Sequence, residues 1–155
     1  AVVDLSDGGI GQLALSRWIA YGGEGDDYFV FNAFSAGGEL YGENGADTFF
    51  LSGSSGNHVE GGEGDDLIVA TESTGNNYLD GGIGNDAILA SEFNDTILGG
   101  DGNDLLVGGL TLTDQADSIN GGSGNDVIIA GFGADTIYGG AGSDFLVAGA
   151  INPNE

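Results

Sequence analysis

Seven aspartates close seven copies of one six-residue turn, whose fullest form is GGxGxD. Carboxylates that recur at one position of a repeat are candidate ligands for a hard cation, and paired carboxylates also perform glycoside hydrolysis. The turn reads GGEGDD at Gly22, GGIGND at Gly81 and, more weakly, GENGAD at Gly42. The closing residues are Asp27, Asp47, Asp66, Asp86, Asp104, Asp126 and Asp144. Which chemistry they support depends on how the chain spaces them.

The spacing of the turns is that of a solenoid. Their starts are separated by 18 to 22 residues, and such a period indicates stacked coils rather than one globular core. Stacking brings the closing aspartates into one file at about 4.8 Å per coil. Two bare carboxylates at that distance repel by roughly 3 kcal/mol at an effective dielectric near 20, so we expect a cation between neighbours. Because the chain has no Cys and one His, the oxygen donors favour calcium over zinc or copper.

The composition also points to cations. The chain has 25 acidic residues, one Arg and no Lys, which gives a formal net charge of -24 over 155 residues. This charge excludes nucleic acid and anionic membranes as natural partners. Hydrophobic residues make up 40% of the chain and recur in register, which excludes an acidic disordered tail. No apolar run reaches the length of a membrane span.

Apolar residues at fixed distances from each turn predict two short strands per coil. The eighth and tenth residues from the first glycine face one way, as the period of two in a strand requires. Another apolar column lies two residues before each turn and predicts a strand on the opposite wall. We therefore expect like strands to stack in parallel around a thin core. The columns are Phe29, Phe49, Ile68, Ile88, Leu106, Ile128 and Leu146; Phe31, Leu51, Ala70, Ala90, Gly108, Ala130 and Ala148; and Leu40, Val59, Leu79, Ile97, Ile119 and Ile137.

The other turn positions have a backbone explanation. A turn this tight needs positive φ at several residues and close approach of the main chain, and glycine provides both. At the fifth position most residues are of types that tolerate a left-handed backbone. We expect the acids Asp26, Asp65 and Asp101 to face solvent. The fifth position holds Asp26, Ala46, Asp65, Asn85, Asn103, Asn125 and Ser143.

The turn and the three residues after it resemble the nonapeptide of the RTX (repeats-in-toxin) family, over about Gly22 to Val147. The resemblance implies an all-β, right-handed parallel β-roll of about seven coils. It also implies that each calcium ion lies between consecutive turns, bound by the closing Asp of both and by turn carbonyls, so that one edge holds about six ions. The implied carbonyl ligands belong to Gly22, Gly25, Gly42, Gly45, Gly61, Gly64, Gly81, Gly84, Gly99, Gly102, Gly121, Gly124, Gly139 and Gly142.

The opposite edge departs from the family pattern. Its residues at the Asp position are Gly38, Asn57, Asn77, Asp95, Asp117 and Asp135, and only AGFGAD at Ala130 approaches a full turn. We therefore expect metal sites on this edge only around Asp117 and Asp135.

The repeats predict one domain over 1–155, with an N-terminal cap at 1–21, repeats at 22–147 and a C-terminal end at 148–155. GGIGQLALS at Gly8 resembles a turn with Leu13 in place of Asp, and together with Arg17 and Trp18 it predicts a cap without metal. Pro153 cannot extend a ladder. Because the chain begins at Ala1 without Met, and no C-terminal export signal is evident, we expect a fragment or a processed piece.

One outer wall is predicted to be apolar and the other polar. Glu39, Glu60, Asp80 and Asn120 mark the polar wall, where His58 is expected to be a lone surface side chain. A contiguous apolar face usually marks an interface, so we expect a second copy or a neighbouring domain to cover it. Its positions are Tyr28, Thr48, Leu67, Ala87, Leu105, Val127 and Phe145, with Val30, Phe50, Val69, Leu89, Val107, Ile129 and Val147.

These observations favour a structural module over an enzyme. With no Cys, one His and one Arg, no nucleophile and base form a pair. The first hypothesis is a module that folds on extracellular calcium, on a secreted or cell-surface protein exported by bacterial type I secretion, as the resemblance implies. The alternative is a calcium-dependent, self-assembling surface-layer or fibre protein. A part of a secreted hydrolase, or a sugar- or ice-binding domain, stays open as a third class.

Overall fold

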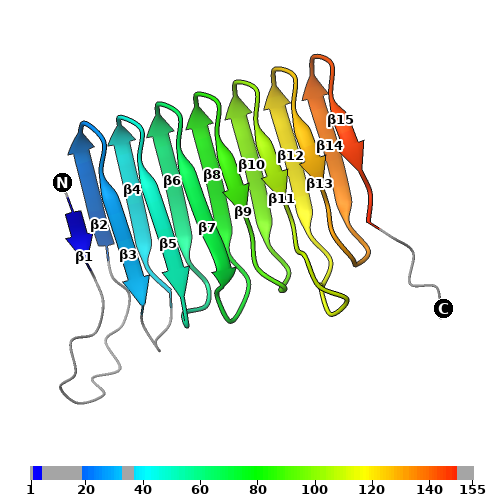
Figure 1. The fold of residues 1–155 in the computed structure, drawn as a ribbon, viewed down its shortest axis with the longest axis horizontal. Helices are drawn as coiled ribbons and strands as arrows, with labels where there is room; N and C mark the ends of the chain where they lie inside the picture. Colours follow the sequence, from blue (N-terminus) through cyan, green and yellow to red (C-terminus); the bar gives the residue numbers. More distant parts are fainter. Residues whose placement is uncertain (1, 5–18, 33–36, 150–155) are drawn as a thin grey trace.

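The computed structural model describes residues 2–4, 19–32 and 37–149, and within these ranges every regular element is a β-strand. The strands form two parallel sheets (Figure 1). Sheet A comprises β1 (Val2–Asp4), β3 (Tyr28–Asn32), β5 (Thr48–Ser52), β7 (Leu67–Glu72), β9 (Ala87–Leu89), β11 (Leu105–Val107), β13 (Val127–Ile129) and β15 (Phe145–Val147). Sheet B comprises β2 (Ile19–Glu24), β4 (Glu39–Asn44), β6 (His58–Glu63), β8 (Tyr78–Ile83), β10 (Thr96–Asp101), β12 (Ser118–Ser123) and β14 (Thr136–Ala141). The predicted all-β solenoid of stacked parallel coils is confirmed, and none of the described residues forms a helix that could cross a membrane.

Each coil passes from a strand of sheet B through a GGxGxD turn into a strand of sheet A (Figure 1). We call the edge that carries these turns the first edge, and the edge where sheet A returns to sheet B the second edge. Neighbouring strands pair in register, with Ile68 opposite Ile88 and Leu79 opposite Ile97. Each column of the sequence therefore becomes a line of side chains along the solenoid.

The predicted apolar columns form one core between the sheets. Phe29 and Phe49 stack in it with ring centroids 4.6 Å apart. At the last coil Leu146 is 46% exposed and Ile137 is only partly buried, because no further coil among the described residues covers them. The buried members are Phe29, Phe31, Leu40, Phe49, Leu51, Val59, Ile68, Ala70, Leu79, Ile88, Ala90, Ile97, Leu106, Ile119, Ile128 and Ala130.

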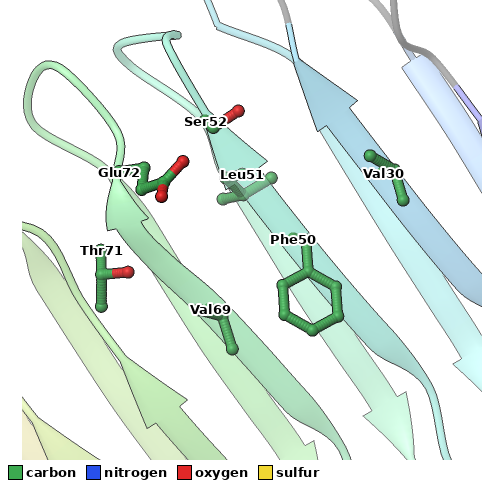
Figure 2. A pocket seen from close by; sticks show the side chains of 7 residues that line it. All are labelled: Val30, Phe50, Leu51, Ser52, Val69, Thr71 and Glu72. Atoms are coloured by element: carbon green, nitrogen blue, oxygen red, sulfur yellow. The ribbon is translucent and has the colours of Figure 1, made fainter.

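The outer face of sheet A is largely apolar, as predicted. Tyr28, Phe50 and Val127 are exposed on it. One position differs, since Val107 is only 8% exposed and does not belong to the open face. The register between β5 and β7 shifts after Phe50. A hollow of ≈ 290 Å³ lies there, lined by Val30, Phe50, Leu51, Ser52, Val69, Thr71 and Glu72 (Figure 2).

The outer face of sheet B is not simply polar, which corrects the sequence prediction. Tyr21 stacks on Tyr41 at 5.1 Å, and His58 stacks on Tyr78 at 4.6 Å. His58 is thus not a lone side chain, since its Nε2 also lies 2.7 Å from Oε1 of Glu60. The parallel register places aromatic residues of successive coils side by side, so their rings stack on one another, although Tyr21 remains 61% exposed.

The N-terminal cap was predicted mainly from residues 8–18, which lie outside the described residues, as does Pro153. Near that end, β1 pairs with β3 and extends sheet A by one strand. The predicted domain boundaries therefore stay a prediction.

Candidate metal centre

The turns of the first edge use their glycines in two ways. The second and fourth residues have positive φ, for example 117° at Gly62 and 127° at Gly64. Glu43 replaces the second glycine in one turn and is the single non-glycine residue with positive φ in the described part of the chain. The first glycine has no positive φ, and a Cβ on it is excluded by space: at Gly61 it would meet Oδ2 of Asp66. The turn therefore folds around the carboxylate of its own closing Asp.

One oxygen of each closing Asp belongs to a hydrogen-bond ladder. The backbone N–H of Asp66 donates to Oδ1 of Asp86 at 2.8 Å, and that of Asp86 donates to Oδ1 of Asp104 at 2.8 Å. The same bond recurs in the other gaps, from Asp27 to Asp47, Asp47 to Asp66, Asp104 to Asp126 and Asp126 to Asp144. The seven predicted aspartates are thus brought into one continuous file.

The second carboxylate oxygen has no such partner. Oδ2 is buried and receives no hydrogen bond from any described group in Asp47, Asp66, Asp86, Asp104 and Asp126. Each of these residues is at most 3% exposed. A buried carboxylate oxygen without a donor costs about 1–3 kcal/mol or more, so this file needs a proton or a cation.

Backbone carbonyls lie at the same gaps between turns. A Cβ on Gly61 would meet both Oδ2 of Asp66 and the carbonyl oxygen of Gly81 in the next coil. A Cβ on Gly84 would lie closer than 3.0 Å to the carbonyl oxygen of Gly64 in the coil before. Twelve of the predicted carbonyl ligands lie between turns in this way. They belong to Gly42, Gly61, Gly81, Gly99, Gly121 and Gly139 at the first turn position, and to Gly25, Gly45, Gly64, Gly84, Gly102 and Gly124 at the fourth. The remaining two, Gly22 and Gly142, belong to the terminal turns, and their carbonyls make no contact of this kind within the described part of the chain.

The electrostatics of the file disfavour bare carboxylates. Burial raises the pKa of Asp66 to about 7 and that of Asp86 to about 6, against the opposing effect of the N–H bonds they accept. Burial also raises the pKa of Asp47 and of Asp104. Neighbouring carboxylates add to the rise at all four. A cation in the gap would offset both the cost of burying these carboxylates and the repulsion between them.

The donors fit a hard cation. Within the described ranges, no group of three or more His, Cys, Asp or Glu side chains could hold a metal alone. Each gap instead combines carboxylates of two coils with glycine carbonyls, an all-oxygen set of the kind calcium prefers. The assignment of these oxygens as calcium ligands stays a prediction.

The fifth turn position differs from the sequence prediction. Its Asp and Asn residues do not have positive φ. They form an outward ladder instead: the N–H and Nδ2 of Asn103 both donate to Oδ1 of Asn85 at 3.0 Å. Asn85 donates likewise to Asp65, and Asn125 to Asn103. As predicted, Asp26, Asp65 and Asp101 are exposed. Side-chain amides here stabilise the stack rather than an unusual backbone.

The second edge has the same kind of ladder without the motif. The N–H of Asn77 donates to Oδ1 of Asp95 at 2.6 Å, that of Asp95 to Oδ1 of Asp117 at 2.8 Å, and that of Asp117 to Oδ1 of Asp135 at 3.0 Å. Upstream, Gly38 and Asn57 donate to the next Asn by longer bonds. The structure therefore brings Asp117 and Asp135 together, and their role as metal ligands stays a prediction.

Sequence reasoning missed the serines and Asp114 on this edge. Ser91 donates to Oδ2 of Asp95 from its N–H at 2.8 Å and from its hydroxyl at 2.7 Å. Ser54 bonds Asn57, and Ser73 bonds Asn77. Their signal was a Ser three or four residues before Asn57, Asn77 and Asp95. Burial raises the pKa of Asp114 to about 6 and that of Asp117 to about 8.

The sequence model for the RTX calcium-binding nonapeptide repeat, in four copies, matches residues 19–34, 51–72, 73–97, 80–110 and 112–146. These ranges cover more than half of the chain and include six of the seven GGxGxD turns. The turn outside them is GENGAD at Gly42, the copy in which Glu43 takes a glycine position. A comparison with curated proteins finds no match.

Proposed function

Because the chain belongs to the family of RTX calcium-binding nonapeptide repeats, it is a calcium-binding β-roll, and we propose that it serves as a structural module that folds on extracellular calcium. The repeats of this family are structural rather than catalytic. In this proposal about six ions lie along the first edge. Each is held by the closing aspartates of two consecutive turns and by the backbone carbonyls of the glycines at the first and fourth turn positions.

The observation that supports the proposal is the line of buried Oδ2 atoms on the first edge. Five of them lie in register without a donor in the described structure, each against the first glycine of its own turn. A chain with a net charge of -24 and a single Arg cannot neutralise them from within. We infer that cations from solution do so, which couples binding to folding.

Two arguments support folding outside the cell: the calcium affinity typical of extracellular modules, and the secretion of proteins that carry RTX repeats. Extracellular calcium modules work with dissociation constants of about 10⁻⁴–10⁻³ M, so such sites are loaded outside the cell rather than in the cytosol. RTX repeats typically belong to secreted bacterial proteins. We therefore propose a secreted or cell-surface protein exported by type I secretion, in which the module stays open until it meets calcium.

Circular dichroism during a calcium titration of the chelator-treated chain tests the proposal. We expect β-structure to appear cooperatively as calcium is added, while magnesium at the same concentration induces less, because it requires a stricter octahedral shell. A chain that keeps its full β-signal after exhaustive chelation, and binds no calcium, would contradict the proposal.

A second candidate function is calcium-dependent assembly through the outer face of sheet A. The observation in its favour is that large apolar side chains remain exposed there, Tyr28 at 41%, Val127 at 37% and Phe145 at 63%. Apolar patches of this kind usually mark interfaces. In this proposal a second copy covers the face once calcium has folded the coils.

Sedimentation velocity separates the two functions. If the face assembles, calcium produces dimers or larger species, and Val69→Lys together with Val127→Lys returns them to monomers. Thr136→Lys, exposed on sheet B, is the control and should leave assembly unchanged. A monomer at all calcium concentrations contradicts assembly and leaves the module function standing.

A further inference from the structure

The hollow on the outer face of sheet A lies at an irregularity in the pairing of its strands. Phe50 of β5 lies opposite Val69 of β7. The next pair is Ser52 with Glu72, so β7 carries one more residue than β5 between the two pairs. Such a bulge bends a strand and re-aims its side chains, and bulges are frequent next to active sites. Because β3–β5 and β7–β9 pair in continuous register, the hollow is a local feature and not a groove that repeats along the face.

The hollow has an apolar part and a polar end. Strand β7 pairs with β9 over its first three residues only, and its remaining residues continue past the end of β9. Thr71 and Glu72 are exposed in this extension. They lie with Ser52 near the ends of the strands, whereas Phe50 and Val69 lie further back along them (Figure 2). A ligand in the hollow would therefore meet apolar side chains at one end and oxygen atoms at the other.

The polar end has hydrogen-bonding capacity that the described chain does not use. The side chains of Ser52, Thr71 and Glu72 form no hydrogen bond or ion pair with another described residue. Glu72 is tied to the coil through its backbone, whose carbonyl accepts the N–H of Gly53 at 3.0 Å. A carboxylate and a hydroxyl can each accept a hydrogen bond, so three side-chain acceptors converge here. An ammonium group has three N–H donors and no acceptor, and it matches such a set.

The lining and the charge of the chain narrow the class of ligand. Calcium takes six to eight oxygen ligands, whereas the hollow offers one carboxylate and two hydroxyls beside apolar side chains. The net charge of -24 disfavours an anion and attracts cations. A second copy of the chain could cover the apolar part, but with one Arg and no Lys it supplies almost no positive charge for Glu72. Charge complementarity thus favours an organic cation that is not part of this chain.

We propose that the hollow binds a small organic cation, an ammonium group attached to one aromatic or branched aliphatic body. The ammonium donates to the carboxylate of Glu72 and to the hydroxyls of Ser52 and Thr71. The apolar body packs on Val69 and on the ring of Phe50, which is 36% exposed and also offers its face to the cation. A volume of ≈ 290 Å³ is at the lower end of the range for ligand pockets, so the body is limited to about one ring.

An NMR titration of the calcium-loaded full chain with phenethylammonium tests the site. We expect amide shifts confined to β5, β7 and the residues next to the hollow. The affinity should be about five- to tenfold higher than that of phenethyl alcohol, the neutral analogue, because only the ammonium gains the ion pair and the contact with the ring face. Methylammonium has the charge without the apolar body, so it controls for the general attraction of cations and should give no localised shifts.

Glu72→Gln separates the charge from the packing. We expect it to lower the affinity for phenethylammonium about fivefold, to that for phenethyl alcohol, and to leave the affinity for the alcohol unchanged. Glu63→Gln is the matched control, because it removes the same charge from an exposed side chain of sheet B, and it should leave both affinities unchanged. Equal effects of the two substitutions would overturn the inference.

The unaltered chain keeps the test decisive if a variant does not fold, since the comparison of ammonium with alcohol needs no substitution. Equal affinities of the two probes there would overturn the inference. Sedimentation velocity on the same samples identifies a second copy as the competing occupant. A dimer without localised phenethylammonium shifts would show that the face is an interface, which overturns this inference and leaves calcium-dependent folding untouched.

Discussion

At the residue scale, the two oxygens of each closing Asp have different tasks. Oδ1 of Asp86 accepts the N–H of Asp66 and holds the coils in register, while its Oδ2 is buried without a partner in the described chain. An Asn in this position keeps the first task and loses the second. The second edge illustrates this, since Asn77 supports the ladder there with a neutral amide. Register and metal binding are therefore separable by single substitutions.

Asp86→Asn should retain the coil and lose calcium. The variant keeps an acceptor for the N–H of Asp66 but removes the charge from the two adjoining gaps. At a calcium concentration about 100 times the dissociation constant, each lost ion removes about 2.7 kcal/mol of stabilisation. Urea unfolding with calcium and with chelator measures this difference. Equal calcium-dependent stabilisation in the variant and the unaltered chain would show that Asp86 is not a ligand.

Gly81→Ala tests whether the first turn position requires glycine because there is no room for a Cβ, rather than because of backbone strain. The φ of Gly81 is not positive, but a Cβ there would meet Oδ2 of Asp86 and the carbonyl of Gly99. We expect a loss of about 1–3 kcal/mol from overpacking, together with weakened calcium binding in that gap. Gly25→Ala is the control, because its φ is 92° and nothing lies within 4 Å of the added Cβ, so that only backbone strain arises. Calcium affinity unchanged by Gly81→Ala would argue against a site at that glycine.

At the element scale, the two edges of the solenoid use one ladder with different side chains. Each rung is a backbone N–H donating to the Oδ1 of an Asp or Asn in the next coil. On the first edge the remaining oxygen faces glycine carbonyls, and on much of the second edge it is replaced by an amide or bonded by Ser. The second edge can therefore hold its coils together with fewer ions.

Asn77→Asp should make this edge depend on calcium or protons. Nδ2 of Asn77 now donates to Oδ1 of Asp95 at 2.9 Å and to the carbonyl of Gly75 at 2.9 Å. The substitution replaces both bonds by repulsion between two buried carboxylates, which costs about 2–4 kcal/mol at pH 7.5 without calcium. Asn76→Asp, at an exposed neighbour, is the control for net charge. Chemical denaturation in chelator measures the difference, and equal stability of the two variants would refute the role of the amide.

The sequence predicted the columns well because they follow from two periods. The strand period of two and the coil period near nineteen together determine which way Ile68 and Leu79 face. The fifth turn position was predicted wrongly, since residue propensity indicated a left-handed backbone whereas Asn85 and Asn103 bond across coils. The serine bonds had a local signal, a Ser three or four residues before Asn57, Asn77 and Asp95. Asp114 could not be predicted, because its partner Phe132 lies a coil away and its loop has no motif. Side-chain pairing between coils is thus the part that local patterns do not encode.

At the scale of the whole molecule, the fold brings together carboxylates that its single Arg cannot neutralise. Ten of the 25 acidic side chains lie in two files along the edges: the seven closing aspartates on the first edge, and Asp95, Asp117 and Asp135 on the second. Without cations, the coil is opposed both by burial of charge and by repulsion between coils. Protons and calcium ions are two alternative ways to remove the same charges. The stability of the metal-free coil should therefore depend on pH in a predictable direction.

The metal-free chain should gain β-structure as the pH falls from 8 to 5.5. The pKa values of Asp66, Asp86 and Asp117 are raised to about 7, 6 and 8, chiefly by burial, while the unfolded chain titrates near 4. Between about pH 5 and 8 the folded chain thus binds more protons than the unfolded one, so its stability falls as the pH rises through that window.

Circular dichroism of the calcium-free chain at pH 5.5, 6.5, 7.5 and 8.5 measures this dependence above the pI of ≈ 4.1, where the chain remains soluble. The variant Asp66→Asn with Asp117→Asn is the control and should flatten the profile, because two of the titrating groups are gone. Since calcium competes with the same protons, binding should also release protons at pH 6.5, as calorimetry in buffers of different ionisation enthalpy detects. A metal-free chain that loses β-structure on acidification would show that the buried carboxylates do not control folding.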